Sequence, residues 1–234
     1  MYRFIVVTLI SALTACGSSM DYSHSPNFNS NLNRFQHPDG DPSNKKPSEL
    51  FAMLREFSKR KYDQSEQNGF SVKLSEQHEL STFSESVMWI GQSTILLNHK
   101  GLTVLTDPQF SNRASPLFFG GPKRVTPIPF NIKDLPNIDV VLISHNHYDH
   151  LDRSSIRNLI KHQPSIKFLV PLGLGQTLYK WGVVDVTELD WWQAINLQDV
   201  EIQPTPVKHW SSRSLLDRNT VSYTHLRAHE TLTD

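Results

Sequence analysis

The fold is decided by the stretch Val140-Val141-Leu142-Ile143-Ser144-His145-Asn146-His147-Tyr148-Asp149-His150-Leu151-Asp152. Its first four residues are apolar and mostly β-branched, which predicts a short buried strand. Four potential metal ligands follow within six residues, namely His145, His147, Asp149 and His150. A polar surface loop that collected histidines by chance is the alternative, and the buried strand directly before the cluster argues against it.

The spacing of these ligands suits a metal site at the end of a strand. Alternate side chains of an extended chain lie on the same side, so His145 and His147 can bind one cation. Asp149 and His150 follow where the chain turns, and they can hold a second cation beside the first. Two divalent cations about 3.5–4 Å apart can share one water molecule and ionise it. We therefore expect a hydrolytic site with two metals.

The flanking segments predict a layered α/β domain. Three short apolar runs split by turn residues come first, which is typical of an antiparallel meander. Strands and helices then alternate, which favours a sheet covered by helices. The expected strands cover residues 87–90, 94–97, 102–105, 140–143, 166–170 and 200–207, and the expected helices cover residues 154–160 and 174–181.

Composition excludes several classes of protein. The 234 residues are 38% hydrophobic and 20% charged, an ordinary globular composition. With 23 basic and 23 acidic residues the net charge is zero, so no overall field attracts nucleic acid, and a nuclease is disfavoured. Eleven histidines against a single cysteine exclude a disulfide scaffold and leave His and carboxylates as metal ligands.

The N-terminal residues 1–16 are typical of a signal peptide. Arg3 is followed by an apolar run over residues 4–13, which is too short to span a bilayer. Leu13-Thr14-Ala15-Cys16 resembles the lipobox of bacterial lipoproteins, which implies cleavage before Cys16 and acylation of that residue. Gly17 after the cysteine resembles the signal for lipid anchoring in the outer membrane, on its periplasmic side. A plain secretory signal with a chance cysteine is the alternative.

Residues 17–47 are predicted to be a disordered tether, because Ser, Asn, Asp and Pro dominate there without a hydrophobic period. Ser48 can cap a helix whose apolar positions Leu50, Phe51, Leu54 and Phe57 have helical spacing. We expect this helix to serve packing.

The motif His145-x-His147-x-Asp149-His150 resembles the central signature of the metallo-β-lactamase superfamily, whose fold is an αββα sandwich with a metal centre along one edge. Over about residues 85–220 the chain also resembles the branch that contains N-acyl-phosphatidylethanolamine-hydrolysing phospholipase D. The segments that carry this second resemblance are Trp89-Ile90-Gly91-Gln92-Ser93-Thr94, Thr106-Asp107-Pro108, Arg113-Ala114-Ser115-Pro116, Gly121-Pro122-Lys123-Arg124, Glu188-Leu189-Asp190-Trp191-Trp192 and His209-Trp210.

The resemblance implies a role for each matching residue. His145, His147 and His209 would form a first zinc site, and Asp149 with His150 would begin a second site and take part in catalysis. Asp107 would support the centre from behind the ligands; a purely structural turn is the alternative for it. Two zinc ions per complete domain are expected, although iron and manganese also accept His and carboxylate ligands.

After Asn219 the chain departs from the family's pattern. The family continues with a bridging Asp in a Gly-Asp-Thr setting and a last His, whereas this chain reads Val221-Ser222-Tyr223-Thr224-His225-Leu226-Arg227-Ala228-His229-Glu230-Thr231. That run resembles a translated sequencing adapter. We therefore expect residues 48–220 to be a hydrolase domain that is incomplete at the C-terminus, and residues 221–234 to be a non-native tail.

An alternative for this tail is a metal site of its own. His225 and His229 lie four residues apart, on one face of a helix, with Glu230 beside them. In a His-Glu-x-x-His zinc helix the Glu lies between the two histidines, and this run has a different order.

The function expected is that of a zinc-dependent hydrolase, a phosphodiesterase of phospholipase D type acting on N-acyl-phosphatidylethanolamine-like phospholipids. A lactonase or other ester hydrolase is one alternative, because the same ionised water attacks a carbonyl carbon. A metal-binding lipoprotein or inactive fragment without turnover is another. Trp191 and Trp192, with residues 117–119, would either bind acyl chains or pack in the core, and Lys123 with Arg124 would either meet a phosphate or be a solvated pair.

Overall fold

The computed structural model describes residues 21–40, 55, 84–116, 119–213 and 217–228. Cys16 and the helix predicted to begin at Ser48 lie outside these residues. None of the helices in the described part of the chain has the length and apolar character needed to cross a bilayer.

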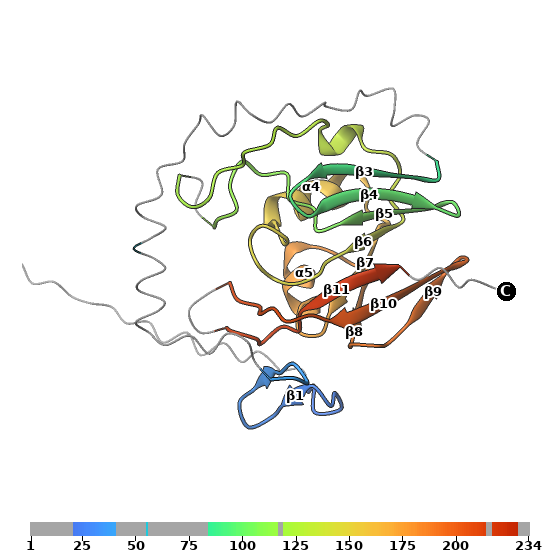
Figure 1. Ribbon diagram of the computed structural model, residues 1–234. Coiled ribbons are helices and arrows are strands. Elements are labelled where there is room, and N and C mark those ends of the chain that lie inside the picture. Colours follow the sequence, from blue (N-terminus) through green and yellow to red (C-terminus); the bar gives the residue numbers. More distant parts are fainter. Residues whose placement is uncertain (1–20, 41–54, 56–83, 117–118, 214–216, 229–234) are drawn as a thin grey trace, which may run out of the picture.

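A six-stranded sheet forms the centre of the molecule (Figure 1). Its first three strands, β3 (Ser86–Gly91), β4 (Thr94–His99) and β5 (Leu102–Thr106), are antiparallel. The next three, β6 (Val140–Leu142), β7 (Lys167–Pro171) and β8 (Val186–Leu189), run parallel to β5 and to one another. The predicted meander followed by alternating strands and helices is therefore confirmed.

A second sheet packs against the first. It has the order β11-β10-β9 and is antiparallel throughout, with β9 (Ile195–Leu197), β10 (Val200–Pro206) and β11 (Thr224–Ala228). Buried leucine and valine side chains of the large sheet fill the space between the two sheets. Ile202 of β10 packs against them from the second sheet.

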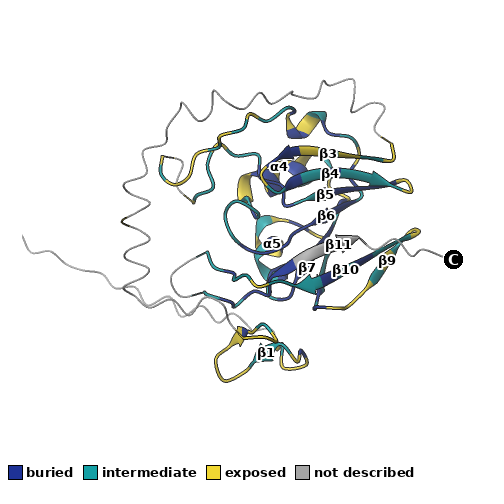
Figure 2. Ribbon diagram, in the orientation of Figure 1, coloured by how far each residue is buried: buried dark blue, intermediate teal, exposed yellow. Residues whose placement is uncertain are grey.

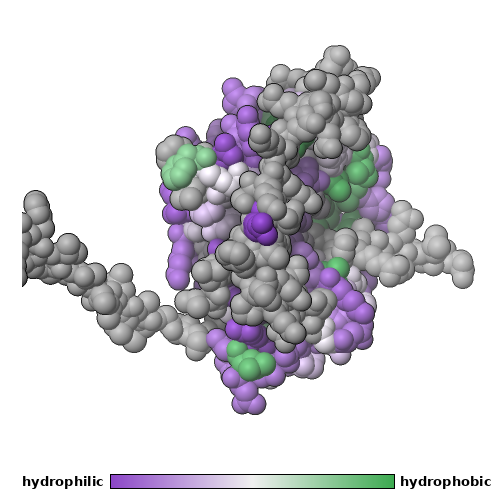
Figure 3. Space-filling view, turned by 60° about the vertical axis from the view of Figure 1, so that its left-hand side comes forward, coloured by the Kyte–Doolittle hydropathy of each residue, from purple (hydrophilic) through white to green (hydrophobic). Residues whose placement is uncertain are grey.

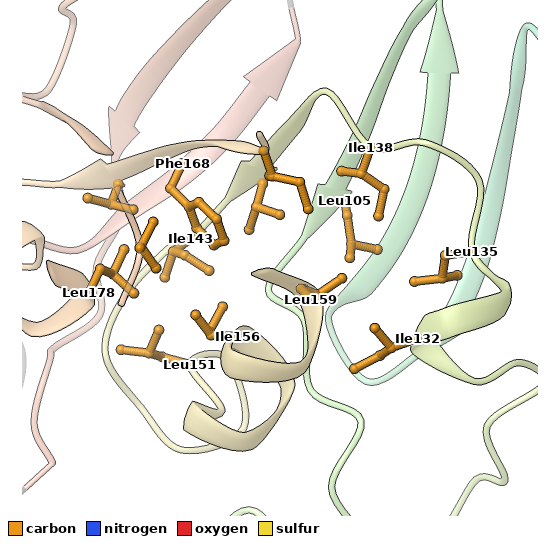
Figure 4. Close-up of a cluster of buried hydrophobic side chains, with 14 of the residues drawn as sticks. Leu105, Ile132, Leu135, Ile138, Ile143, Leu151, Ile156, Leu159, Phe168 and Leu178 are labelled. Atoms are coloured by element: carbon orange, nitrogen blue, oxygen red, sulfur yellow. The ribbon is translucent and has the colours of Figure 1, made fainter. Parts of the chain in front are cut away.

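Helices cover the other face of the large sheet. They are the 3-10 helix η1 (Ile132–Asp134), α4 (Arg153–His162) and α5 (Gly175–Trp181). The side chain of Asp152 caps α4 by accepting a hydrogen bond from the Ser154 main-chain N–H at 3.2 Å. Figure 4 shows Ile156, Leu159 and Leu178 from the two α-helices packed against Leu105, Ile143 and Phe168 from the sheet.

The alternation of side chains along each strand produces these two cores. Val141 and Ile143 face the helices, whereas Val140 and Leu142 face the second sheet. Strands buried on both faces read as continuous apolar runs, as residues 140–143 do. Buried residues accordingly concentrate in β5, β6 and β7 (Figure 2). The layers confirm the predicted α/β sandwich, with two packed sheets and helices over the outer face of the large sheet.

The structure differs from the predicted disordered tether over residues 21–40. This segment contains a small hairpin of β1 (Phe28–Asn29) and β2 (Arg34–Phe35). Phe35 has no exposed surface, and its ring lies 5.0 Å from that of Phe28 and 5.6 Å from that of Tyr22. The Tyr22 hydroxyl also donates to Glu188 at 3.2 Å. The three aromatic side chains compensate the ordering entropy, which the average composition of the segment did not predict.

Residues 221–228 are part of the sandwich in this structure. Val221, Ser222, Tyr223 and Thr224 are buried, and the indole N–H of Trp191 donates to the Tyr223 carbonyl at 2.8 Å. The main chain of β11 then pairs with β10 from Pro206 to Ile202. Its strand pairing is at odds with a helix through His225. That residues 221–234 are a non-native tail stays a prediction about their origin.

Candidate metal centre

The residues expected to bind metal come from the ends of two strands in different sheets. His145, His147, Asp149 and His150 lie in the loop after β6, and His209 lies in the loop after β10. Sandwich packing brings the two loops together, so that residues more than sixty positions apart in the chain are in contact. The resemblance implied these five residues as ligands.

Three imidazole nitrogens form a small triangle. His145 Nε2 lies 2.8 Å from His147 Nδ1, and His209 Nε2 lies 3.1 Å and 3.2 Å from these two atoms. Within the described residues, these three side chains form a group whose ligand atoms lie close enough together to hold one metal ion. In a tetrahedral site with bonds of about 2.0–2.1 Å, ligand nitrogens lie about 3.3 Å apart. The triangle therefore fits a single divalent cation.

Asp107 and Ser144 set the orientation of the ligand rings. Asp107, which follows β5, accepts hydrogen bonds from the Ser144 main-chain N–H and hydroxyl, both at 2.7 Å. Because that hydroxyl proton goes to Asp107, the Ser144 oxygen is free to accept the Nδ1–H of His145 at 2.9 Å. The lone pair of His145 Nε2 then points into the triangle, as metal binding requires.

Burial keeps two of these histidines neutral. Burial has the largest effect on His145 and lowers its pKa far below the ordinary value. The neighbouring His150, His147 and His209 lower this pKa further. Burial, followed by His209, lowers the pKa of His147 to about 4, although Asp149 opposes this shift. Neutral imidazoles carry the lone pairs that bind a metal ion, so these ligands are ready at neutral pH.

His150 and Asp149 lie beside the triangle. The His150 ring is 4.1 Å from the His145 ring, and its Nε2 is 3.6 Å from the Asp149 carboxylate. Burial alone would lower the pKa of His150, but its hydrogen bond to Asp107 at 2.8 Å, with the charges of Asp107 and Asp149, raises it overall. The same hydrogen bond holds the proton on Nδ1. His150 Nε2 and the Asp149 carboxylate are thus placed so that both could bind a second cation. They are the two ligands that the described residues offer to it.

An open pocket of about 540 Å³ borders the histidines. Its wall combines polar, cationic and apolar groups, supplied by Gln92, Gln109, Ala114, Pro122, Lys123, Arg124, Val125, Thr126, His147, Tyr148, Asp149 and Trp210. The Gln92 side-chain amide donates to Asp149 at 3.0 Å, which ties the β3–β4 turn to the site. Among the coloured residues on the face seen in Figure 3, hydrophobic ones gather in a few separate areas between hydrophilic ones.

Of the other residues that the sequence singled out, the two tryptophans are not part of the pocket wall, whereas the two basic residues are. Trp191 is only 5% exposed and belongs to the core, whereas Trp192 is exposed. Arg124 lies in the pocket wall, but its guanidinium donates to the main-chain oxygens of Gln109 and Ser111. Lys123 is exposed at the same pocket. Sequence reasoning gave no role to Ser144, although its place between the strand and the first histidine was the available signal.

Known proteins resemble part of this chain. A family model described as the beta-lactamase superfamily domain matches residues 103–229. N-acyl-phosphatidylethanolamine-hydrolyzing phospholipase D 1 of Caenorhabditis elegans is 37% identical over 140 residues, which are 56% of this chain and 39% of that protein. The mitochondrial enzyme of the same name from Saccharomyces cerevisiae is 40% identical over 135 residues, 56% of this chain and 28% of that protein.

The chain also matches part of a solved structure. CmlA, a diiron beta-hydroxylase from Streptomyces venezuelae, is 25% identical with a TM-score of 0.42, over 69% of this chain and 30% of that chain. The chain spans less than two fifths of the length of the two phospholipases it matches. Since the family model covers more than half of its residues, the chain belongs to the beta-lactamase superfamily domain family.

Proposed function

We propose that this domain is a zinc-dependent phosphodiesterase of phospholipase D type, acting on N-acyl-phosphatidylethanolamine-like phospholipids. The observation that carries the proposal is the triangle of His145, His147 and His209 beside an open pocket that also contains Asp149. The identity of 37–40% to two N-acyl-phosphatidylethanolamine-hydrolysing phospholipases supports the choice of substrate class.

The histidine triangle would hold one ion, and Asp149 with His150 would provide ligands for a second. When bound, such ions polarise a phosphoryl oxygen and lower the pKa of water towards neutrality. We propose zinc because neutral imidazoles and a carboxylate are suitable ligands for it; iron and manganese accept the same ligands. Elemental analysis of the purified chain distinguishes these metals.

The pocket residues give the substrate its orientation in this proposal. Lys123 places a positive charge at the pocket, where it can attract the phosphate of a phospholipid. Val125 and Trp210 offer apolar surface to an acyl chain or to the linker beside the phosphate. Gln92 holds the Asp149 carboxylate by its hydrogen bond and so limits the directions in which this ligand can point.

The reaction would add water to phosphorus and release the head-group alcohol. The water hydroxyl becomes part of the phosphate, the phosphorus–oxygen bond to the head group breaks, and the leaving oxygen takes up a proton. The products are a phosphatidic acid and an N-acyl amino alcohol.

A lipid anchor at Cys16 would place the domain on the periplasmic side of the outer membrane. The sequence Leu13-Thr14-Ala15-Cys16-Gly17 supports this location. Several acyl chains hold a protein on a bilayer far more firmly than one chain does. The enzyme would then meet phospholipids by diffusion in the plane of the membrane.

The test is hydrolysis by the zinc-loaded 234-residue chain of N-acyl-phosphatidylethanolamine, an acyl-homoserine lactone and a simple carboxylic ester, with products identified by mass spectrometry. Release of phosphatidic acid from the first substrate supports the proposal. Turnover of the lactone or the ester alone would refute the phosphodiesterase assignment in favour of an ester hydrolase. Stoichiometric zinc without turnover of any substrate would favour the alternative of a metal-binding lipoprotein or inactive fragment.

A further inference from the structure

Arg213 lies where the two metal-binding loops meet. It follows His209 by four residues in the loop after β10, and its guanidinium reaches the loop after β6. Its Nη1 donates to the main-chain oxygen of Asn146 at 3.0 Å and to that of Leu151 at 2.6 Å. One side chain therefore contacts both the beginning and the end of the loop that carries four of the expected ligands.

Aromatic rings hold the guanidinium in this position. Its Cζ lies 3.9 Å from the centre of the Tyr148 ring and 5.4 Å from that of Trp181. The Tyr148 hydroxyl donates to the main-chain oxygen of Arg213 at 3.3 Å, so the tyrosine contacts both the side chain and the backbone. A planar guanidinium can stack on a ring and donate hydrogen bonds along its edge at the same time.

The backbone of Arg213 is anchored on its own loop. Its main-chain N–H donates to both carboxylate oxygens of Asp217, at 3.0 Å and 3.1 Å. The Ser212 hydroxyl donates to the same carboxylate at 3.0 Å. A displacement of the loop after β6 would therefore also displace Arg213 and the segment that carries His209. Arg213 thus links the two loops.

The two acceptor carbonyls belong to buried residues. Asn146 is 2% exposed and Leu151 is fully buried, so their main-chain oxygens need donors within the protein. Between them the chain makes a tight turn, in which the N–H groups of His150 and Leu151 donate to His147. A lysine at position 213 would keep the charge but lose the planar stacking surface and the fixed fork of donors.

The geometry points to Arg213 as a positioning residue of the metal centre, which clamps the loop of residues 145–151 to the segment of His209 and so keeps the three imidazole nitrogens within reach of one cation. This role rests on the metal centre of the proposed function. In the described part of the chain the guanidinium of Arg213 contacts main-chain oxygens and aromatic rings, so it acts on the ligand nitrogens through the two loops. Loss of such a supporting contact in metalloproteins typically costs about 10–100-fold in metal affinity.

The experiment compares Arg213→Ala and Arg213→Lys with Arg157→Ala, an exposed arginine on α4, in the 234-residue chain. Three quantities are measured: Co²⁺ affinity with the visible absorption spectrum of the bound ion, amide hydrogen exchange of residues 145–152 without metal, and the urea midpoint of unfolding. We expect Arg213→Ala to lower Co²⁺ affinity by about 10–100-fold and to accelerate exchange in this loop. Arg213→Lys should show a smaller loss, and Arg157→Ala should match the wild type.

Added methylguanidinium should restore part of the Co²⁺ affinity of Arg213→Ala and leave Arg157→Ala unaffected. Wild-type Co²⁺ affinity in the Arg213 variants would overturn the role, even if exchange became faster. If Arg213→Ala does not fold, Arg213→Lys decides: reduced affinity at an unchanged urea midpoint supports the clamp, and unchanged affinity overturns it. A wild-type chain that bound no Co²⁺ would refute the metal centre of the proposed function and this role together, whereas equal binding by wild type and variants refutes the role alone.

Discussion

Asp107 is the residue on which the orientation of two imidazoles depends. It accepts hydrogen bonds from the Ser144 hydroxyl at 2.7 Å and from His150 Nδ1 at 2.8 Å, and through Ser144 it also sets the tautomer of His145. Each of these contacts needs an acceptor oxygen at position 107. The carboxylate therefore directs two ring nitrogens towards the expected cations without being a ligand in the triangle.

Replacing Asp107 by Asn tests this arrangement. The amide would present N–H groups where an acceptor is needed, so we expect zinc affinity to fall by about 10–100-fold. Competition with a chelating dye measures that affinity. Asp199→Asn is the matched control, because Asp199 is exposed and distant from the β6 loop in sequence. Equal zinc affinity in both variants would refute the role of Asp107.

Among the expected metal ligands, His147 is the one for which truncation gives the sharpest prediction. Its Nδ1 lies 2.8 Å from His145 Nε2 and 3.2 Å from His209 Nε2, so it occupies one corner of the triangle. His147→Ala should remove the first-site metal and abolish hydrolysis. Zinc content and turnover are measured beside His162→Ala, which changes an exposed histidine on α4. Full zinc content with an unchanged rate in His147→Ala would contradict the assignment.

At the scale of elements, the N-terminal hairpin β1–β2 joins the body of the domain through more than its aromatic cluster. The Phe35 main-chain N–H donates to the Asn219 carbonyl at 2.8 Å, and the Asn219 side chain accepts from the Ser211 main-chain N–H at 3.0 Å. Lys208, next to His209, forms an ion pair with Asp39 at 3.5 Å. The hairpin thus contacts both ends of the loop that carries His209.

Phe35→Ala measures how strongly this element is held. Removing a fully buried phenylalanine costs about 3–5 kcal/mol through lost transfer free energy and the cavity left behind. We expect a fall of that size in the free energy of unfolding by urea. Leu32→Ala in the same hairpin is the control, because Leu32 is 55% exposed and should change the value little. Equal stability of both variants would mean that residues 21–40 behave as the tether that composition predicts.

At the scale of the whole molecule, the proposed anchor at Cys16 would determine where the domain works. Cys16 is the single cysteine of the chain and stands at the end of the apolar run of residues 4–13. Cys16→Ser removes the sulfur to which a diacylglyceryl group would attach. In a Gram-negative bacterial host we expect the wild type in the outer-membrane fraction and the variant outside it, as measured by sucrose-gradient fractionation and immunoblotting. The same distribution for both proteins would refute the lipoprotein proposal.

Much of the large sheet was predictable because its signals are local. Continuous apolar runs, turn residues between them and helical spacing predicted β3 to β7 and α4 to within one or two residues. The structure of the 17–47 segment was harder to predict, because its three packed aromatic residues show no hydrophobic period along the sequence. They stabilise the segment only through contacts with one another that form in the folded chain. Trp191 was ambiguous for a similar reason, since its sequence position is compatible with a surface and with a core.

The sequence by itself determined the layered α/β class and the cluster His145-x-His147-x-Asp149-His150, because strand periodicity and ligand spacing act between neighbours in the chain. Only the tertiary structure decided how the ligands are held. The bonds of Asp107 to His150 and of Arg213 to Asn146 join residues 43 and 67 positions apart. Such contacts depend on how two sheets and their loops pack, and no local pattern in the chain specifies them.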